Sequence, residues 1–240
     1  MASANLRTIA VGSDDLDWAV QVLRQRREPL VELAPVFWRP AADASDQHRA
    51  FLEHLVSEGG AKAFRTDTAI LVAVPRGEGW LVDDLYVPGS DWANGDGRTL
   101  WNALDGEAHG SQVRLVCPTY EGDRAEFTRA AGLSIAESWW LLELPGAAGG
   151  EAGVRVDLAG ADAITVAAPP VYDPPGPILF LPSVSEASTA LPAAVDRAPR
   201  LGCAAIVVNH VAGDDALAQA LARAGFRQHC DYFTGAIDSI

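Results

Sequence analysis

Hydrophobic residues follow two different spacings along residues 1–145, and these spacings predict alternating strands and helices. Apolar runs bounded by glycine or proline predict a strand at residues 6–11, strands within residues 63–74 and 79–87, a strand at 113–117, and a strand or hairpin at 133–144. Apolar residues three and four apart predict a helix that ends at Pro29, helices at residues 48–58 and 122–131, and a helix after Gly97. The resulting order, β-α-α-β-β-β-α-β-α-β, predicts an α/β (α+β) fold.

A second, shorter half repeats part of this pattern after a linker of small residues, PGAAGGEAG at 145–153. The segment Arg129–Leu133 (RAAGL) is similar to Ala222–Phe226 (ARAGF), and a pair of aromatic residues follows each segment at the same distance. We therefore predict a first domain at residues 1–145 and a second, shortened domain at residues 151–240.

The stretch from Trp80 to Leu104, WLVDDLYVPGSDWANGDGRTLWNAL, joins a predicted strand, a glycine-rich loop and a predicted helix. Strict alternation would give one face of the strand Trp80, Val82, Asp84 and Tyr86, and the other face Leu81, Asp83, Leu85 and Val87. Gly95 and Gly97 permit close backbone approach, while the N–H groups and dipole of a helix start favour an anion. This pattern fits a loop that holds a phosphate, and the alternative is an ordinary turn from a strand to a helix.

The segments DDLYV and GDGRTLWNAL resemble the strand–loop–helix segment of the GNAT superfamily of CoA-dependent N-acyltransferases. In that family an Arg/Gln-x-x-Gly-x-Gly/Ala loop cradles the CoA pyrophosphate. Here the pattern falls on WANGDG, with both glycines present but with Trp92 in the place of Arg or Gln. Asp96 adds a carboxylate near the expected pyrophosphate, and Arg98 can offset its charge. The resemblance implies a mixed central sheet of GNAT type and two related GNAT-like halves, the second without the glycine loop.

The resemblance also implies that acetyl-CoA, or another acyl-CoA, binds as a co-substrate, chiefly through backbone N–H groups. The residues implied to bind it come from the end of the strand and from the loop. They are Leu85, Tyr86, Val87, Trp92, Asn94, Gly95, Asp96, Gly97, Arg98 and Thr99.

Acyl transfer from a thioester to an amine needs a base, a stabilised oxyanion and a proton for the leaving thiolate. Members of the family often carry an acidic base at the position of Asp84, which is the candidate here. Their usual acid is a tyrosine four residues before a Gly-Phe pair, but Thr128 and Leu221 stand at that position in the two halves. Tyr120 is the candidate replacement. The alternatives are a solvated acidic pair for Asp83 and Asp84, and a partly buried aromatic for Tyr120.

Composition narrows the choice of partners. A formal net charge of −14 disfavours nucleic acid and anionic membranes, and it mildly favours a cationic substrate such as an amine. The three cysteines and five histidines show no metal-ligand spacing, so no metal is expected. Widely spaced cysteines, odd in number, are typical of reduced thiols, and the N-terminus lacks a signal-peptide pattern. We therefore expect a cytoplasmic protein.

Together with the resemblance, these features predict an acetyltransferase of GNAT type. It would move an acyl group from CoA to the amine of a small molecule or peptide by direct transfer through a tetrahedral intermediate. The missing tyrosine and the missing loop Arg or Gln leave a second hypothesis open, a non-catalytic GNAT-like module that binds CoA or a protein partner. The acceptor, the acyl chain and the oligomeric state, including a homodimer, stay open at this point.

Overall fold

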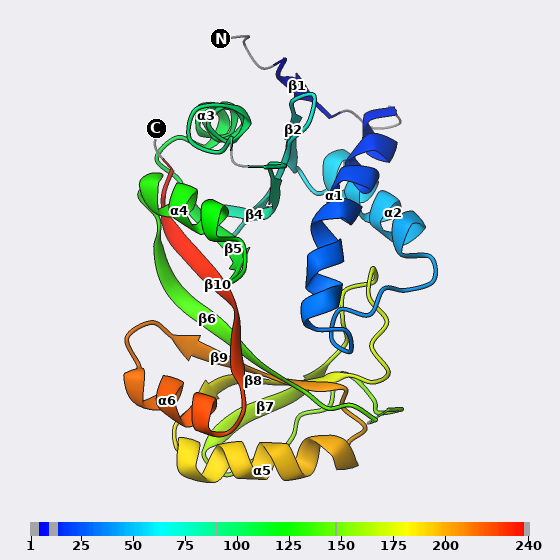
Figure 1. Cartoon of the computed structure of the whole chain (residues 1–240), viewed down its shortest axis with the longest axis vertical. Coiled ribbons are helices and arrows are strands. Elements are labelled where there is room, and N and C mark those ends of the chain that lie inside the picture. Colours follow the sequence, from blue (N-terminus) through cyan, green and yellow to red (C-terminus); the bar gives the residue numbers. More distant parts are fainter. Residues whose placement is uncertain (1–4, 10–13, 90, 147, 238–240) are drawn as a thin grey trace. The chain divides into compact units, whose positions relative to one another are not determined.

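A computed structural model describes residues 5–9, 14–89, 91–146 and 148–237 of the chain (Figure 1). The helices are α1 (Asp14–Leu33), α2 (Ala44–Ser57), α3 (Asp96–Ala108), α4 (Gly122–Ala130), α5 (Ala187–Arg200) and α6 (Asp215–Arg223). The strands of the first part are β1 (Arg7–Thr8), β2 (Lys62–Arg65), β3 (Ile70–Arg76), β4 (Gly79–Tyr86), β5 (Gln112–Pro118) and β6 (Ser134–Glu143). Those of the second part are β7 (Ala161–Val166), β8 (Ile178–Val184), β9 (Ala205–Val211) and β10 (Arg227–Ala236). The predicted element order and the α/β (α+β) class are confirmed, although residues 10 and 11 of the first predicted strand lie outside the described residues.

The chain forms two compact units. Unit 1 comprises Met1–Arg27, Ser45–Ala136 and Asp231–Ile240, and unit 2 comprises Glu28–Ala44 and Glu137–Cys230. This division follows compactness, whereas the predicted domains at residues 1–145 and 151–240 describe related halves of the sequence. Those domains therefore stay a prediction.

The sheet of unit 1 has the strand order β1-β2-β3-β4-β5-β10. The neighbours from β1 through β4 pair in antiparallel orientation, and β4 pairs with β5 in parallel orientation. One face packs Ile70 and Val72 against α1 and α2 through Leu23 and Leu52. The other face packs against α3 and α4, with Trp101 fully buried in its core. Helices thus cover both faces of β3 and β4, and β4 carries part of the predicted site.

The sheet of unit 2 has the strand order β6-β9-β8-β7 and is also mixed, since β8 pairs with β9 in parallel and the other pairs are antiparallel. Helices α5 and α6 pack on one face through Leu191, Leu217 and Leu221. Figure 1 shows α5 along that face. Phe37, from the segment after α1, packs on the opposite face. Unit 2 therefore takes part of its core from residues that precede α2 in sequence.

Four of the described elements contribute residues to both units, namely α1, α2, β6 and β10. The last of them matters most for unit 1. Phe233 and Ile237 have no exposed surface and belong to the same core as Trp101. The core that supports the predicted site therefore includes residues from the far end of the sequence.

Within the described residues three prolines lie inside helices, contrary to the sequence prediction for Pro29. Helix α1 continues through Pro29 to Leu33, and α5 contains both Pro192 and Pro199. A proline removes one backbone hydrogen bond from a helix. In both helices apolar side chains beyond the proline are buried, as in the case of Leu30 and Ala194, and this packing offsets the loss.

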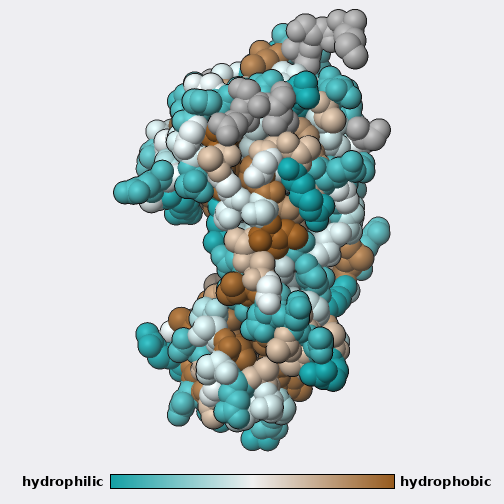
Figure 2. Space-filling model, turned by 90° about the vertical axis from the view of Figure 1, so that its left-hand side faces the viewer, coloured by the Kyte–Doolittle hydropathy of each residue, from teal (hydrophilic) through white to brown (hydrophobic). Residues whose placement is uncertain are grey.

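No helix within the described residues is long and apolar enough to cross a membrane. The face drawn in Figure 2 carries many hydrophilic side chains, as expected for a chain with a net charge of −14. Hydrophobic side chains also reach this face, which is common in folded proteins.

Candidate functional site

The parallel strands β4 and β5 separate before they end. Their pairing runs from Trp80 opposite Val113 to Val82 opposite Leu115, whereas β4 continues to Tyr86 and β5 to Pro118. Within these described strands, backbone groups beyond Val82 and Leu115 do not pair with each other. Backbone polar groups at such a separation are available to a ligand. The same arrangement recurs in unit 2, where pairing of β8 with β9 ends at Leu181 opposite Val208.

A β-bulge lies at this separation and changes which side chains share a face. Val82 pairs with Ala73, but Asp84 pairs with the next residue, Val72, so Asp83 is the extra residue of the bulge. Strict alternation along β4 is therefore wrong. The bulge keeps Val82 and Leu85 in the same core and turns Asp84 toward the face that α1 and α2 cover.

Two arginines and two carboxylates form a buried cluster at this point. Arg26 of α1 binds Oδ1 of Asp84 through Nη1, and its Nε donates to Oε1 of Glu121 at 3.3 Å. The other carboxylate oxygen of Glu121, Oε2, accepts from Nη1 of Arg124 at 2.9 Å. All four residues belong to unit 1. They link α1, β4 and the start of α4 by charge-assisted hydrogen bonds, which are stronger than neutral ones.

The histidine of α2 borders this cluster. Nε2 of His48 lies 3.9 Å from Oδ2 of Asp84, and Nδ1 of His48 contacts Nη1 of Arg27. Burial, followed by the charges of Arg27 and Arg26, lowers the pKa of His48 to about 4, although Asp84 opposes the shift. At neutral pH this imidazole is therefore neutral.

The neighbouring carboxyls Asp83 and Asp84 are pushed in opposite directions. Burial, and then the charge of Asp84, raises the pKa of Asp83 to about 6. Burial alone would also raise the pKa of Asp84, but Arg26, His48 and Arg124 outweigh it and hold that pKa below its usual range. Asp83 is thus the stronger proton acceptor of the two, and Asp84 stays ionised as the partner of Arg26. Two acids with divergent pKa values are typical of acid–base sites.

The predicted residues at the end of β4 lie beside this cluster. Leu85 and Val87 are buried in the core under α3 and α4, while Tyr86 packs on the α1 and α2 side. Tyr120 is half-buried in the turn between β5 and α4, directly before Glu121. The structure therefore brings the candidate base and the candidate acid to the two strands that separate. Their catalytic roles stay a prediction.

The glycine loop forms the start of α3, with Gly95 at the N-cap position and Asp96 as the first helical residue. A Cβ atom on Gly97 would lie 2.5 Å from the carbonyl oxygen of Trp92, so only glycine allows this close approach. Trp92 is buried against Phe127, with ring centroids 5.5 Å apart. Trp92 thus anchors the loop to α4.

Several loop N–H groups already donate within the loop. Gly97 N–H donates to the carbonyl of Asp91 at 3.4 Å, and Arg98 N–H donates to the carbonyl of Trp92 at 3.0 Å. Thr99 N–H donates to the carbonyl of Gly95 at 3.0 Å, the first hydrogen bond of the helix. The long Gly97 bond is the weakest of the three. Binding of a pyrophosphate by Gly97 and Arg98 would therefore require these bonds to be exchanged, and the role of the loop, including exposed Asn94, stays a prediction.

Thr128, at the position of the family's tyrosine, has no exposed surface. Its hydroxyl donates to the carbonyl of Arg124 at 2.7 Å, within α4. The hydroxyl of Thr128 therefore binds the backbone of its own helix, and it is not exposed to a ligand.

Sequence reasoning missed Arg26, Glu121, Arg124 and His48 as members of the site. Arg26 and Asp84 are 58 positions apart in sequence, and Arg26 and Glu121 are 95 apart. No local pattern signals such pairs. The adjacent acids Asp83 and Asp84 at the end of a buried strand were the one available signal, since buried charges need partners.

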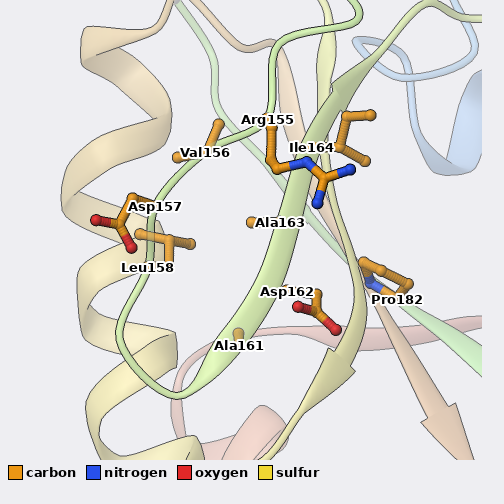
Figure 3. A pocket seen from close by; sticks show the side chains of 9 residues that line it. All are labelled: Arg155, Val156, Asp157, Leu158, Ala161, Asp162, Ala163, Ile164 and Pro182. Atoms are coloured by element: carbon orange, nitrogen blue, oxygen red, sulfur yellow. The ribbon is translucent and has the colours of Figure 1, made fainter.

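Two hollows lie elsewhere. In unit 1, a groove of about 530 Å³ at the start of β4 and β5 is lined in part by Trp80, Arg114 and Tyr232. In unit 2, a groove of about 600 Å³ runs along β7 (Figure 3). In that view the side chains of Val156 and Leu158 point toward a helix. The side chains of Arg155, Asp162 and Pro182 lie on the side of β7 away from that helix. Neither groove contains a predicted site residue.

Among the residues that the structure describes, no three His, Cys, Asp or Glu side chains are grouped as a metal site would require.

Comparison with known proteins identifies the fold. The chain has the fold of the GNAT acetyltransferases, as the recognition from sequence anticipated. No protein-family sequence model matches the chain, and no curated protein matches it by sequence.

Three solved structures carry this comparison. A tandem GNAT protein from the clavulanic acid biosynthesis pathway, without AcCoA, is 13% identical with a TM-score of 0.51, over 97% of this chain and 98% of the other. A putative acetyltransferase from Pyrococcus horikoshii is 11% identical with a TM-score of 0.53, over 100% of this chain and 91% of the other. One from Thermoplasma acidophilum is 12% identical with a TM-score of 0.57, over 96% and 99%. At these identities the likeness establishes the fold, and the activity has to be argued from the site.

Proposed function

We propose that unit 1 is an N-acyltransferase that uses acetyl-CoA, or another acyl-CoA, to acylate the amine of a small molecule or peptide. The amine nitrogen attacks the thioester carbonyl, a tetrahedral intermediate forms, and the carbon–sulfur bond breaks to release the CoA thiolate. The observation that carries this proposal is the separation of β4 from β5 beside a buried pair of carboxyls with divergent pKa values.

We assign the two proton transfers to residues at this separation. The Asp83–Asp84 pair accepts the proton of the attacking amine, with Asp83 as the stronger base and Asp84 held ionised by Arg26. Tyr120, in the turn after β5, supplies a proton to the thiolate. The start of α3, from Gly95 to Thr99, holds the pyrophosphate once its internal hydrogen bonds are exchanged for bonds to the ligand.

The first test is calorimetric titration with acetyl-CoA of the wild type, Gly97→Trp and Gly106→Trp. Both glycines belong to α3, but a side chain at Gly97 meets Trp92, whereas a side chain at Gly106 meets nothing within 4 Å. We expect micromolar binding by the wild type and by Gly106→Trp, and loss of binding in Gly97→Trp. Absence of binding to the wild type would exclude the acyltransferase.

A second candidate function is a non-catalytic module that binds CoA or a protein partner. The internally bonded loop and the buried Thr128 favour it. Release of free CoA thiol from acetyl-CoA in the presence of an amine panel separates the two functions. Thiol release that depends on the amine indicates the enzyme, whereas tight binding of CoA without release indicates the module.

A further inference from the structure

Arg124 has hydrogen-bonding capacity that the structure leaves unused. Arg124 is only 1% exposed, and its Nη1 atom donates a hydrogen bond to Glu121. Its Nε and Nη2 atoms are buried and have no hydrogen-bond partner among the residues that the structure describes. Buried polar groups without partners are rare in folded proteins, and a charged one is costly. A ligand that accepts hydrogen bonds from Nε and Nη2 would remove this cost.

The two unused nitrogens form one edge of the guanidinium group. N–H bonds on Nε and Nη2 point the same way, which is the geometry with which arginine binds a carboxylate or phosphate through two parallel hydrogen bonds. We call this edge the Arg124 fork. A water molecule brings no charge to the buried guanidinium, whereas an anion with two oxygens makes two charge-assisted hydrogen bonds to the fork.

The carboxylates nearest to the fork are already in use. Glu121 gives one oxygen to Arg26 and the other to Nη1 of Arg124. Asp84 is bound by Arg26. If either carboxylate rotated to bind the fork, it would lose a hydrogen bond that it now accepts from Arg26 or from Nη1 of Arg124. Asp83, whose carboxyl also feels the charge of Arg124, makes no hydrogen bond to Nε or Nη2. We therefore infer that the anion that fills the fork comes from outside the chain.

The surroundings favour an anion of single charge. Glu121 adjoins the fork, and Asp83 is close enough for the charge of Arg124 to act on its carboxyl. Both acids repel a phosphate dianion more strongly than a carboxylate. The same acids attract a cationic group carried next to that carboxylate. A molecule with an amine beside a carboxylate satisfies both requirements.

We propose that the acyl acceptor is a molecule of the amino-acid class, with its carboxylate held by the Arg124 fork and its amine directed to the Asp83–Asp84 pair. This inference rests on the proposed acyltransferase function for the amine, but binding of the carboxylate does not depend on it. Because Nε and Nη2 of Arg124 are buried, binding requires a local rearrangement that exposes them. The ligand then replaces an unsatisfied buried charge by a charge-assisted pair.

The test uses matched sets of three compounds. Glycine, leucine, phenylalanine and glutamate are each compared with the corresponding amide and with the corresponding decarboxylated amine. Calorimetric titration without acetyl-CoA measures binding, and release of CoA thiol with acetyl-CoA measures transfer. We expect at least one amino acid to bind about tenfold or more tightly than its amide and its amine.

The variants are Arg124→Gln, Arg124→Lys and Arg129→Gln. Arg124→Gln removes the charge, and Arg124→Lys keeps the charge but not the fork, so both lose the preference for the carboxylate. Arg129 is exposed on the same helix, and its replacement keeps the preference. If Arg124→Gln does not fold, the comparison of wild type with Arg124→Lys and the wild-type compound series still decide.

The outcomes separate this inference from the proposed function. Binding of an amino acid without any acyl transfer supports carboxylate binding by the Arg124 fork and excludes the acyltransferase function. Acyl transfer to amines and amino acids at equal rates keeps the acyltransferase and overturns the fork. Failure of every carboxylate to bind more tightly than its amide also overturns the fork.

Discussion

Nε1 of Trp38 donates a hydrogen bond to Nε2 of His229 at 2.6 Å, although 191 positions separate the two residues in sequence. Both side chains belong to unit 2, where the rings of Phe37 and Tyr172 also pack against Trp38. An indole N–H can only donate, so Nε2 of His229 must be unprotonated to accept. The bond therefore requires a neutral histidine.

This bond predicts a dependence of stability on pH. Burial, and then the charge of Arg227, lowers the pKa of His229 from 6.5 to about 4. In the unfolded chain the residue gains a proton as the pH falls below 6.5, while the folded chain resists until about 4. Stability is thus fully present above pH 6.5 and is lost as the pH falls toward 4, by roughly 3 kcal/mol from this residue.

His229→Gln tests this dependence, because glutamine does not titrate. Urea unfolding between pH 7 and 4.5 should show a smaller loss of unfolding free energy for the variant than for the wild type. His48 still contributes in the variant, because its pKa is also lowered to about 4. His54→Gln, at a largely exposed position, should follow the wild type. Identical profiles for His229→Gln and the wild type would refute the assignment.

Alanine substitutions at two glycines of α3 should have opposite effects on stability. A Cβ atom at Gly97 would lie 2.5 Å from the oxygen and 2.9 Å from the Cα of Trp92, so Gly97→Ala should destabilise the protein by roughly 1–3 kcal/mol. Gly106→Ala meets no neighbour and should stabilise α3 by roughly 0.5–1 kcal/mol. Chemical denaturation measures both. Equal effects of the two substitutions would show that the loop does not approach Trp92 so closely.

Removing either partner of the Arg26–Asp84 pair should be costly. Their side chains are 9% and 12% exposed, so Arg26→Gln leaves the buried charge of Asp84 without its arginine, and Asp84→Asn leaves Arg26 with Glu121 alone. The cost should be roughly 3–5 kcal/mol. The double variant should lose less than the sum of the single variants, because it leaves neither charge alone. Strict additivity in this double-mutant cycle would argue against the pair.

The exposed pair Arg49–Asp17, at 2.7 Å, is the control, and its cycle should show little coupling. The cost at Asp84 also bears on the activity test. Loss of acyl transfer in Asp84→Asn indicates a catalytic role only if the variant is folded under the conditions of the assay.

Cys117 should be inert in the folded protein. Burial raises the pKa of its thiol to about 11, and 1% of the residue is exposed. Because the thiolate is the reactive form, an alkylating reagent at pH 8 should leave Cys117 unmodified until the protein is unfolded in guanidinium. Mass spectrometry of the peptide that contains Cys117 reads the result. Rapid native labelling would contradict it, and Cys117→Ala should retain acyl transfer.

The order of helices and strands could be predicted because each depends on local spacing. The strand Gly79–Tyr86 and the glycine loop before α3 were both visible in the pattern of residues 80–104. The bulge at Asp83 was not, because one extra residue in a strand leaves the sequence looking like uninterrupted alternation. That single residue reversed the predicted faces from Asp84 onward.

The charged cluster was hidden for a different reason. Nothing in the local pattern distinguishes Arg26 from Arg24 or Arg27, which stand on the same helix. What selects Arg26 is the packing of α1 on the sheet beside Asp84 and Glu121, a contact between distant parts of the chain. The acids could be suspected from sequence, whereas their partners required the fold.

The inclusion of Phe233 in the core of unit 1 affects how the protein is made. On the ribosome, residues 45–136 emerge before residues 137–230 of unit 2, but the core around Trp101 lacks Phe233 and Ile237 until those residues of unit 2 have been synthesised. Domains of many proteins fold in turn as the chain emerges. Unit 1 cannot follow this order of folding, because its core is incomplete until Phe233 and Ile237 have been synthesised. Both units therefore complete their cores at nearly the same moment of synthesis.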